Sequence, residues 1–515
     1  MSSPSDPRVA TRLPAGHLPS VRARILGIGL VAVGLAAGAG VATAQAPDGP
    51  RVTLQPAALA AEAAPVGSQS SSWYCTGGTG GTGHTATPGA TTTIVLANAS
   101  TRRVTGTMDV VDGRGQTGSR TFVVPPDGQI DERPGTVLAG AWLAARVDVH
   151  GGGVTASELL RASSGTAMIP CASETSLHWY FAQATTVRGA SLFVSLFNPT
   201  TNLAVVDLTF HTVSGLISPA PDQGIVVDPG RLVTVTVGQY VQDERDVATV
   251  VSARSGAVTA AELQVYDVGG VAGMALVPGV PAPARRWELP YLLDVAGGAS
   301  ELSVLNPSRS VPAHVTVAVR LPTGTAAPFE QVVAPSSVWS LETSSQLRIP
   351  TGVAYSLEIT ATGGPGVVVG RIGAGTPQSA APQWGSQVGI PVPVASGPYA
   401  TRWLVPCVAG GAVSGKAATT RTVASATPSP AARAPGDVVV FDNPGTVARR
   451  ASVRVMTGGG VRVVGTVHVA PHGIATLGAR VGPLLVDANR PLAIEELATP
   501  AGSAGVIALS AVQQR

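Results

Sequence analysis

The chain has 515 residues, of which 44% are hydrophobic and only 12% are charged, and its formal net charge is +3. This length exceeds what one hydrophobic core supports, and the composition is too apolar for a disordered chain, so we expect a globular protein of several domains. Lys416 is the single lysine among the 33 basic residues, which form no run longer than a pair. Because nucleic-acid binding needs a concentrated basic face, the sequence argues against it.

The N-terminus has the order of an export signal. Residues 1–24 are predicted to form a basic cytoplasmic leader, and residues 25–44 hold an uncharged apolar run followed by the small residues Ala42-Thr43-Ala44. This is the arrangement of a signal peptide with a cleavage site. The run also reaches the lower limit of a membrane span, so an uncut anchor remains an alternative. In either case we expect the rest of the chain outside the cytoplasm, secreted or anchored to the cell membrane.

Beyond residues 45–72, which are rich in Ala and Pro and predict a stalk, one pattern occurs four times. Each copy has a tryptophan near its start, then an asparagine in an apolar phrase such as "LFVSLFNPT" (192–200), then a proline 28 to 31 residues later. Self-similarity at a near-constant period indicates tandem copies of one module. The markers are Trp73, Trp179, Trp287 and Trp403; Asn98, Asn198, Asn306 and Asn443; and Pro126, Pro229, Pro335 and Pro471.

Each copy has the pattern of β-structure. Short runs rich in Val, Thr and Leu, such as "AHVTVAV" (313–319), alternate and are bounded by Gly, Pro, Asn and Asp. The asparagine phrase is predicted to end a strand, because proline stops the ladder and the asparagine side chain can bond the turn backbone. We predict an all-β fold of four tandem β-sandwiches of immunoglobulin-like type; a propeller-like or stacked β-repeat array is the alternative. The modules are placed at residues 73–176, 177–284, 285–400 and 401–515, the last with a flexible insertion at 410–437.

These markers carry a resemblance. The exported leader, the tryptophan heading each module, "LFVSLFNPT", "VVDPGRLVTVTVG" (226–238) and "VVSARSGAVTAAEL" (250–263) together resemble a family of actinobacterial secreted or membrane-anchored proteins defined only as a domain of unknown function. The resemblance spans most of residues 73–515 and is strongest in 179–284. That family has no established catalytic residues, so the resemblance implies at most a role in the cell envelope.

The cysteines predict one disulfide. Outside the cytoplasm disulfides persist, and three cysteines leave one thiol over. Cys75 lies near the start of the first module and Cys171 near its end, so a bridge between them would link the two ends of that module. The alternative bridge, from Cys75 to Cys407, would tie the first module to the last and indicate a closed assembly.

Two motifs resemble ligand-binding sites, but each lacks a feature that such a site needs. The segment "GGAVSGKA" (410–417) has the spacing of a phosphate-binding loop, but Ala417 replaces the Ser or Thr that holds Mg²⁺. His468 and His472 would share a face only on a helix, and Pro471 stands between them in strand-like sequence. We therefore expect no metal and no cofactor.

Acidic residues give no catalytic set. The segment "QDERD" (242–246) is predicted to be a solvated loop. Glu158, Glu262 and Glu496 recur between copies, but no second carboxylate recurs at a fixed offset, and Arg371 stands at this place in the third copy. Because Arg146 and Arg254 lie just upstream of the first two glutamates, we predict cross-strand salt bridges.

The sequence thus favours a non-catalytic structural or interaction protein of the cell envelope. Its expected partners are an envelope protein or cell-wall glycan, with the membrane contacted through the N-terminal segment and no nucleic acid. Two alternatives remain: a glycan-binding module array, which would show exposed aromatic residues on one face, and an extracytoplasmic hydrolase with a site between modules.

Overall fold

The computed structural model describes residues 61–80, 89–269, 271–294, 298–322, 324–374, 384–388, 390–391, 401–407, 438–478, 482–498, 507–510 and 512–514. All of them belong to one compact unit, Ala57–Arg515. The predicted leader, the export segment, most of the stalk and the insertion with Lys416 lie outside the described residues.

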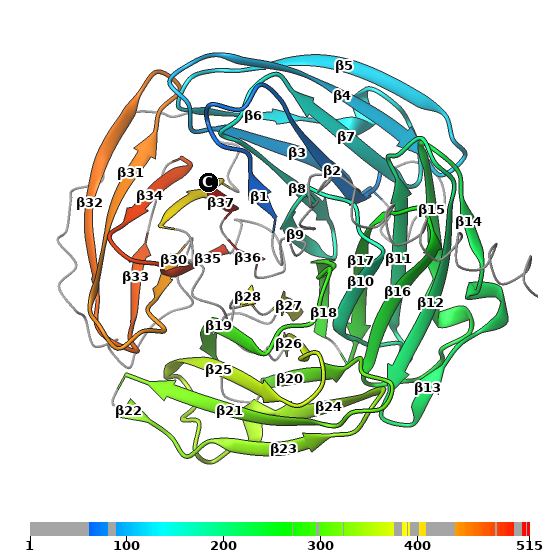
Figure 1. The fold of residues 1–515 in the computed structure, drawn as a ribbon, viewed down its shortest axis with the longest axis vertical. Helices are drawn as coiled ribbons and strands as arrows, with labels where there is room; N and C mark the ends of the chain where they lie inside the picture. The colour runs from blue at the N-terminus through cyan, green and yellow to red at the C-terminus, as the bar shows by residue number, and fades with distance from the viewer. Residues whose placement is uncertain are drawn as a thin grey trace, which may run out of the picture. The chain divides into compact units, whose positions relative to one another are not determined.

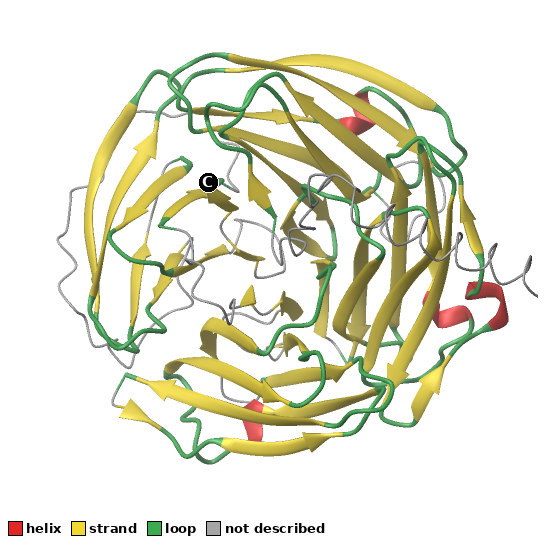
Figure 2. Ribbon diagram, viewed as in Figure 1, coloured by secondary structure: helices red, strands yellow, loops and turns green. Residues whose placement is uncertain are grey.

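Within the described part of the chain, the secondary structure consists of β-strands and four single-turn 3₁₀ helices (Figure 2). The alternating pattern of the sequence explains the strands: in residues 104–110 every second side chain is buried, as expected for a strand with one face on a core. The all-β prediction is confirmed. No helix among the described residues is both long and apolar enough to cross a membrane.

Each module is a sandwich of two antiparallel sheets. With its strands numbered 1 to 8 in chain order, one sheet has the order 1-6-3-4 and the other 5-2-7-8. The central pairings, 2 with 5 and 3 with 6, are those of the immunoglobulin sandwich. Relative to the constant-type fold, strands 1 and 7 are exchanged between the sheets, and strand 4 pairs with strand 3 instead of strand 5. The sandwich architecture is thus confirmed with its own strand order.

In the first two modules the strands follow this scheme, and strand 4 of module 2 is split into two short pieces. Module 1 contains β2 (Ser71–Gly78), β3 (Thr91–Asn98), β4 (Val104–Asp112), β5 (Thr117–Val124), β6 (Gly128–Glu132), η1 (Pro134–Thr136), β7 (Leu143–Val149), β8 (Val154–Ala162) and β9 (Gly165–Pro170). Module 2 contains β10 (His178–Ala184), β11 (Ala190–Asn198), β12 (Ala204–Thr212), β13 (Gly215–Ile217), η2 (Ala220–Asp222), β14 (Ile225–Val227), β15 (Arg231–Thr236), η3 (Val237–Gln239), β16 (Val247–Ser255), β17 (Thr259–Val268) and β18 (Val271–Pro278).

The last two modules repeat the scheme with additional short strands. Module 3 contains β19 (Arg286–Leu293), β20 (Ala299–Asn306), β21 (Ala313–Leu321), β22 (Gly324–Thr325), β23 (Phe329–Val333), β24 (Ser337–Glu342), η4 (Thr343–Ser345), β25 (Ala354–Thr362), β26 (Val368–Ala374), β27 (Trp384–Val388) and β28 (Ile390–Pro391). Module 4 contains β29 (Arg402–Val405), β30 (Val438–Asp442), β31 (Arg449–Met456), β32 (Val461–Val469), β33 (Ile474–Gly478), β34 (Leu484–Ala488), β35 (Ala493–Ala498), β36 (Ile507–Ser510) and β37 (Val512–Gln514).

The marker tryptophans anchor the four cores. Each lies on strand 1 and is at most 6% exposed. The indole N–H of Trp179 donates to Val258 O at 2.8 Å, and that of Trp287 donates to Val367 O at 2.9 Å. In the first three modules a bulge follows between the second and fifth residues after the tryptophan. The repeat marker therefore fixes both a core and a local irregularity of strand 1.

The disulfide joins Cys75 on β2 to Cys171 just after β9, and it lies in the core of module 1. Since β2 and β9 belong to opposite sheets, the bridge ties the two halves of the sandwich together. Cys407 is a buried cysteine outside this bridge. The predicted pairing is confirmed, and the alternative pairing with Cys407 is wrong.

The marker asparagines and prolines form one structural unit, which we call the Asn-Pro turn. Each asparagine is fully buried at the end of strand 2. Its side-chain oxygen accepts the backbone N–H two residues later, at 2.9 to 3.1 Å. Its Nδ2 donates to a backbone carbonyl one or two residues before the marker proline, for example Asn98 to Pro125 O at 3.0 Å and Asn443 to Ala470 O at 2.8 Å. The unit joins the end of strand 2 to the turn before strand 5, which explains the constant spacing of the two markers.

The residue after each marker proline adopts a left-handed backbone. Its φ is 44° at Asp127, 67° at Gly230, 53° at Ser336 and 50° at His472. A turn with proline followed by positive φ is of type II, which favours glycine at the second position. Only the second module meets this preference.

The modules contact one another in a closed order. Strand 8 of each module contacts strand 8 of the next, from β9 through β18 and β27 to β36, and β36 contacts β9 again (Figure 1). The short strand β1 (Glu62–Ala63) pairs in parallel with β37, and Ala63 and Val512 both lie in the core of module 1. The end of the predicted stalk is thus part of the folded unit, and closure needs no disulfide between the first and last modules.

We expect Asn198→Ala to lower the free energy of unfolding of module 2 by about 2 to 4 kcal/mol, because it leaves several buried backbone groups without partners. Hydrogen exchange of the β11 and β12 amides measures the loss. Asn202→Ala, which truncates an exposed side chain in the same turn, is the matched control and should change little. Equal effects of the two substitutions would contradict this role.

The left-handed position gives a second, paired prediction. Gly230→Ala should destabilise by about 1 kcal/mol through backbone strain alone, since an added Cβ meets no atom within 4 Å. Ser336→Gly should stabilise by about 0.5 kcal/mol at the equivalent position. Thermal unfolding of the two variants checks both signs, and a stabilising Gly230→Ala would refute the argument.

Candidate functional site

Consecutive modules meet through the same pair of surfaces. The end of strand 3 in one module contacts the Asn-Pro turn of the next, and this holds for all four modules, including the fourth against the first. The contacts are Arg231 Nη1 to Arg114 O at 3.2 Å, His211 Nδ1 to Ser336 O at 2.9 Å, Arg320 Nη1 to Asp442 Oδ2 at 3.9 Å, and Gly458 N to Asp127 O at 2.8 Å. We call each such contact a joint; the first module therefore closes the series.

The register of the strands identifies equivalent positions in the joints. In each module, strand 6 pairs with both strand 1 and strand 3, so its register matches the marker tryptophan to one residue of strand 3. The joint position lies three residues after that residue, and it is occupied by Val111, His211, Arg320 and Met456 in modules 1 to 4. The residue after each tryptophan lies nearby on strand 1: these residues are Tyr74, Tyr180, Glu288 and Leu404. The facing module contributes the residue before its marker asparagine, which is Phe197, Leu305, Asp442 or Ala97.

Two of the joints are apolar at these positions. In the joint between modules 1 and 2, Val111 packs with Phe197 and Leu232, and Tyr74 packs against them. In the joint between modules 4 and 1, Leu404, Met456 and Leu485 pack with Ala97, one of the buried residues of that joint. Burial of such side chains is the usual source of association energy.

The joint between modules 2 and 3 is mixed. Ala182, Ala248 and Val250 of module 2 pack into the core of module 3, and β18 bridges β27 in parallel, so that sheets of the two modules are continuous. Arg245 also forms an ion pair with Glu301 at 2.9 Å.

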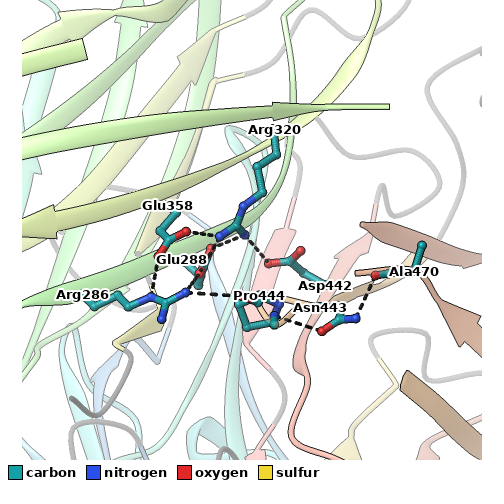
Figure 3. Close-up of polar contacts among 9 residues, drawn as sticks. Arg286, Glu288, Arg320, Glu358, Asp442, Asn443, Pro444 and Ala470 are labelled. Atoms are coloured by element: carbon teal, nitrogen blue, oxygen red, sulfur yellow. Dashed lines mark hydrogen bonds and ion pairs between the residues drawn. The ribbon is translucent and has the colours of Figure 1, made fainter. Parts of the chain in front are cut away.

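The joint between modules 3 and 4 is charged instead (Figure 3). Glu288 on β19 is fully buried and accepts from Arg320 Nη1 at 3.1 Å. Arg320 also pairs with Glu358 on β25, and it faces Asp442 at the end of β30. Arg286 completes the cluster with a 2.6 Å contact to Glu358 and a hydrogen bond of 3.5 Å to Pro444 O in module 4.

Burial sets the electrostatics of this cluster. Burial, with repulsion from Asp442 as the next cause, raises the pKa of Glu288 well above its usual range. Burial raises the pKa of Asp442 to about 7, against the opposing effect of Arg320. Because Arg320 pairs with Glu288 and Glu358 and faces Asp442 of the next module, we assign the cluster a structural role in the joint.

The recurring acids occupy one register position on strand 7. Glu158 pairs across the sheet with Ile94, Glu262 with Val194, Arg371 with Leu302 and Glu496 with Val439, each partner lying four residues before the marker asparagine. Glu158, Glu262 and Glu496 are at most 1% exposed. The predicted salt bridges are wrong, because Arg146 and Arg254 lie on strand 6 of the opposite sheet and pair with Asp148 and Asp207.

Each module satisfies this position differently. Glu158 accepts the N–H of Gly77, in the bulge of strand 1, at 3.0 Å, and burial raises its pKa to about 7. Burial raises the pKa of Glu262 to about 8, against the opposing effect of the Thr249 hydroxyl. In module 3, Arg371 forms an ion pair with Asp294 at 2.9 Å instead. The same strand 7 position thus holds a carboxyl group with a raised pKa in modules 1 and 2 and an ion-paired arginine in module 3. This difference argues against a shared catalytic role.

The remaining predicted candidates do not converge. His468 and His472 are both exposed, and His472 is the left-handed residue of its turn. No cluster of His, Cys, Asp and Glu able to hold a metal ion occurs among the residues that the structure describes. The segment 242–246 is only partly solvated: Asp246 is 8% exposed, and burial raises its pKa to about 7.

The charged joint does not follow from any single motif of the sequence. Its members are far apart in the chain, and only Glu288 and Asp442 adjoin repeat markers, whereas Arg320 and Glu358 do not. A signal was nevertheless present, because Asp442 precedes its marker asparagine where the other copies have Ala97, Phe197 and Leu305. Superposing the four copies on that marker would have identified the charged position.

Comparison with known proteins gives a family match over part of the chain. Residues 160–345 match the model of a family of unknown function, DUF5719. This range runs from the end of module 1 through module 2 into module 3, and it supports the resemblance to a domain of unknown function. No curated protein matches the chain. Among solved structures, "Crystal Structure of Thermotoga maritima 1070" matches with 17% identity, 21% of this chain and 96% of that chain covered, and a TM-score of 0.20.

The buried glutamates predict how stability depends on pH. Because the folded pKa of Glu262 is about 8 and that of a free glutamate about 4.5, the folded state keeps a proton that the unfolded state loses between these values. Stability due to this group should therefore be greatest below about pH 4.5 and fall by about 1.4 kcal/mol per pH unit up to pH 8. Glu262→Gln should remove this loss and stabilise the protein at pH 8 but not at pH 4.5.

Denaturant unfolding at several pH values measures the effect. Glu158→Gln is the matched variant at the equivalent position, and its gain should have the same sign but be smaller, since the pKa of Glu158 rises only to about 7. A Glu262→Gln variant whose stability falls with pH as steeply as that of the unmodified chain would contradict the assignment.

Proposed function

We propose that this protein is an exported, non-catalytic scaffold of the cell envelope, which holds four β-sandwiches in a closed order and presents their loops to another envelope component. The observation that carries the proposal is the series of four joints. Each joint uses equivalent positions, and the fourth module contacts the first, so every module has both of its joint surfaces covered. The loops outside the joints are free to differ between modules, and binding residues usually lie on loops.

The disulfide supports a location outside the cytoplasm. A buried bridge in the core of module 1 forms and persists in an oxidising compartment. It agrees with the export signal expected from residues 25–44. Whether that segment is cut or retained as a membrane anchor does not affect the scaffold.

The alternatives have less support. A hydrolase needs an acid, base or nucleophile set converging on a cleft, whereas the recurring acids Glu158, Glu262 and Glu496 are buried inside separate sandwiches and Glu288 and Asp442 are buried in a joint. A glycan-binding array needs exposed aromatic rings, and among the residues whose burial the structure describes Tyr240 is the one large aromatic residue that is exposed. The expected partner is therefore an envelope protein, with a cell-wall glycan as the second candidate.

Crosslinking on intact cells tests the proposal. A membrane-impermeant crosslinker should capture the same partner with the unmodified chain and with Glu158→Gln or Glu262→Gln, and the cellular role should be retained. Removal of module 2, which breaks the series of joints, should abolish both. Acid-quenched peptide mapping from the same cells should recover the Cys75–Cys171 bridge.

Two outcomes would overturn the proposal. If either glutamine variant folds with its disulfide intact and loses the cellular role, the protein acts through that carboxyl group. If the crosslinker labels the protein only after lysis, the protein is not outside the cytoplasm.

A further inference from the structure

The charged joint between modules 3 and 4 differs from the apolar joint between modules 4 and 1 in chemistry and not in position. The cross-strand pair Glu288 and Glu358 corresponds to the pair Leu404 and Leu485. Arg320 corresponds to Met456, and Asp442 corresponds to Ala97. The same backbone frame therefore carries an apolar set of four residues in one joint and a charged set in another.

Stability alone does not account for the charged set. Taking ions out of water costs several kcal/mol each, and replacing a buried ion cluster by apolar residues of similar volume is often neutral or stabilising. The apolar set of the joint between modules 4 and 1 shows that this frame accommodates such residues. A retained cluster of buried charges therefore suggests a role in specificity.

Docking between the modules has to be specific because the modules are copies of one another. One chain holds four similar strand 3 ends and four similar Asn-Pro turns, and each end has to find the turn of the next module. The two surfaces of a joint differ from one another, and surfaces of this kind link molecules into open chains when they dock between copies. Wrong docking within or between chains is therefore a hazard of the architecture.

The charged residues of this joint make docking between the wrong surfaces unfavourable. The surface formed by Glu288, Arg320 and Glu358 would meet Ala97, Phe197 or Leu305 if it docked on the turn of another module. The cluster would then lack the charge of Asp442. If the Asp442 turn docked on another strand 3 end, its carboxyl group would lose Arg320 and meet Val111, His211 or Met456, of which only His211 offers a polar group. Burying a carboxyl group without a polar partner is unfavourable.

We propose that the surface formed by Glu288, Arg320 and Glu358 is an interaction surface selective for the Asp442 turn of module 4, and that it fixes the order in which the modules join. It excludes the turns of the other three modules, whether they belong to the same chain or to a second copy. This inference concerns the assembly of the chain and does not depend on its cellular role.

The test transplants the apolar set onto the charged joint. The full-length variant Glu288→Leu, Arg320→Met, Glu358→Leu and Asp442→Ala reproduces the four residues of the joint between modules 4 and 1. It is unfolded in denaturant with its disulfide intact and refolded at increasing protein concentration, and the products are separated by size and weighed by native mass spectrometry. We expect less of the species that the unmodified chain forms and more of larger assemblies, and this shift should grow with protein concentration. The reason is that the strand 3 ends of modules 3 and 4 now fit the same turns.

The control removes a surface ion pair of module 2 by Arg254→Met, which leaves Asp207 in place to accept the N–H of Gly224. It should refold as the unmodified chain does at every concentration. A quadruple variant that also refolds so, with native β-structure, would overturn the proposal.

A second variant keeps the proposal testable if the quadruple variant does not fold. Asp442→Ala alone removes the charge from the turn and leaves Arg320 paired with Glu288 and Glu358. It should also lose the native species to larger assemblies, to a smaller extent. Refolding of this variant without any such loss, over the same concentrations, would equally overturn the proposal.

Discussion

A strand that ends inside a β-sandwich leaves backbone groups that have to find partners, and in this protein one asparagine side chain provides them in every module. The amide is suited to the place because it carries two donors and an acceptor on a short stem. Its oxygen closes the turn that follows strand 2, and its nitrogen holds the segment before strand 5. An aspartate would lack the donors, and a serine would lack the reach. The two sheets of each sandwich therefore keep a fixed relation at this end.

The same turn is the surface on which the preceding module docks. Because the turn is held rigidly by the asparagine, the residue before it points in a defined direction, and four modules can use one frame with different side chains. Local turn geometry and the assembly of the modules are thus coupled: a substitution that loosens the turn of module 4 should also loosen the joint made by Asp442. This coupling explains why the marker is the best preserved phrase of the repeat, whereas the facing side chains range from alanine to an ion cluster.

Much of this architecture could be predicted from the sequence, since it depends on short-range patterns. Alternating residues predict the strands, the period of Trp179 and Trp287 predicts the modules, and the positions of Cys75 and Cys171 predict the bridge. The exchange of strands 1 and 7 between sheets could not be predicted, because either sheet offers an apolar face of the same period. The recurring glutamates were assigned to salt bridges because sequence distance does not tell which sheet a strand joins. The charged joint was missed for a related reason: its members come from four strands of two modules.

The parallel pairing of β1 with β37 has a consequence for the time course of folding. Glu62 is among the first described residues to be synthesised, and its partner Gln513 is among the last, so this contact has nearly the largest sequence separation possible among the described residues. Contacts of this kind form late, because the loop between them has to be closed first. The first module is therefore complete in its own strands and disulfide long before its core receives Val512. Until then, β1 lacks its partner strand β37, and the place of Val512 in the core of the first module stays unfilled.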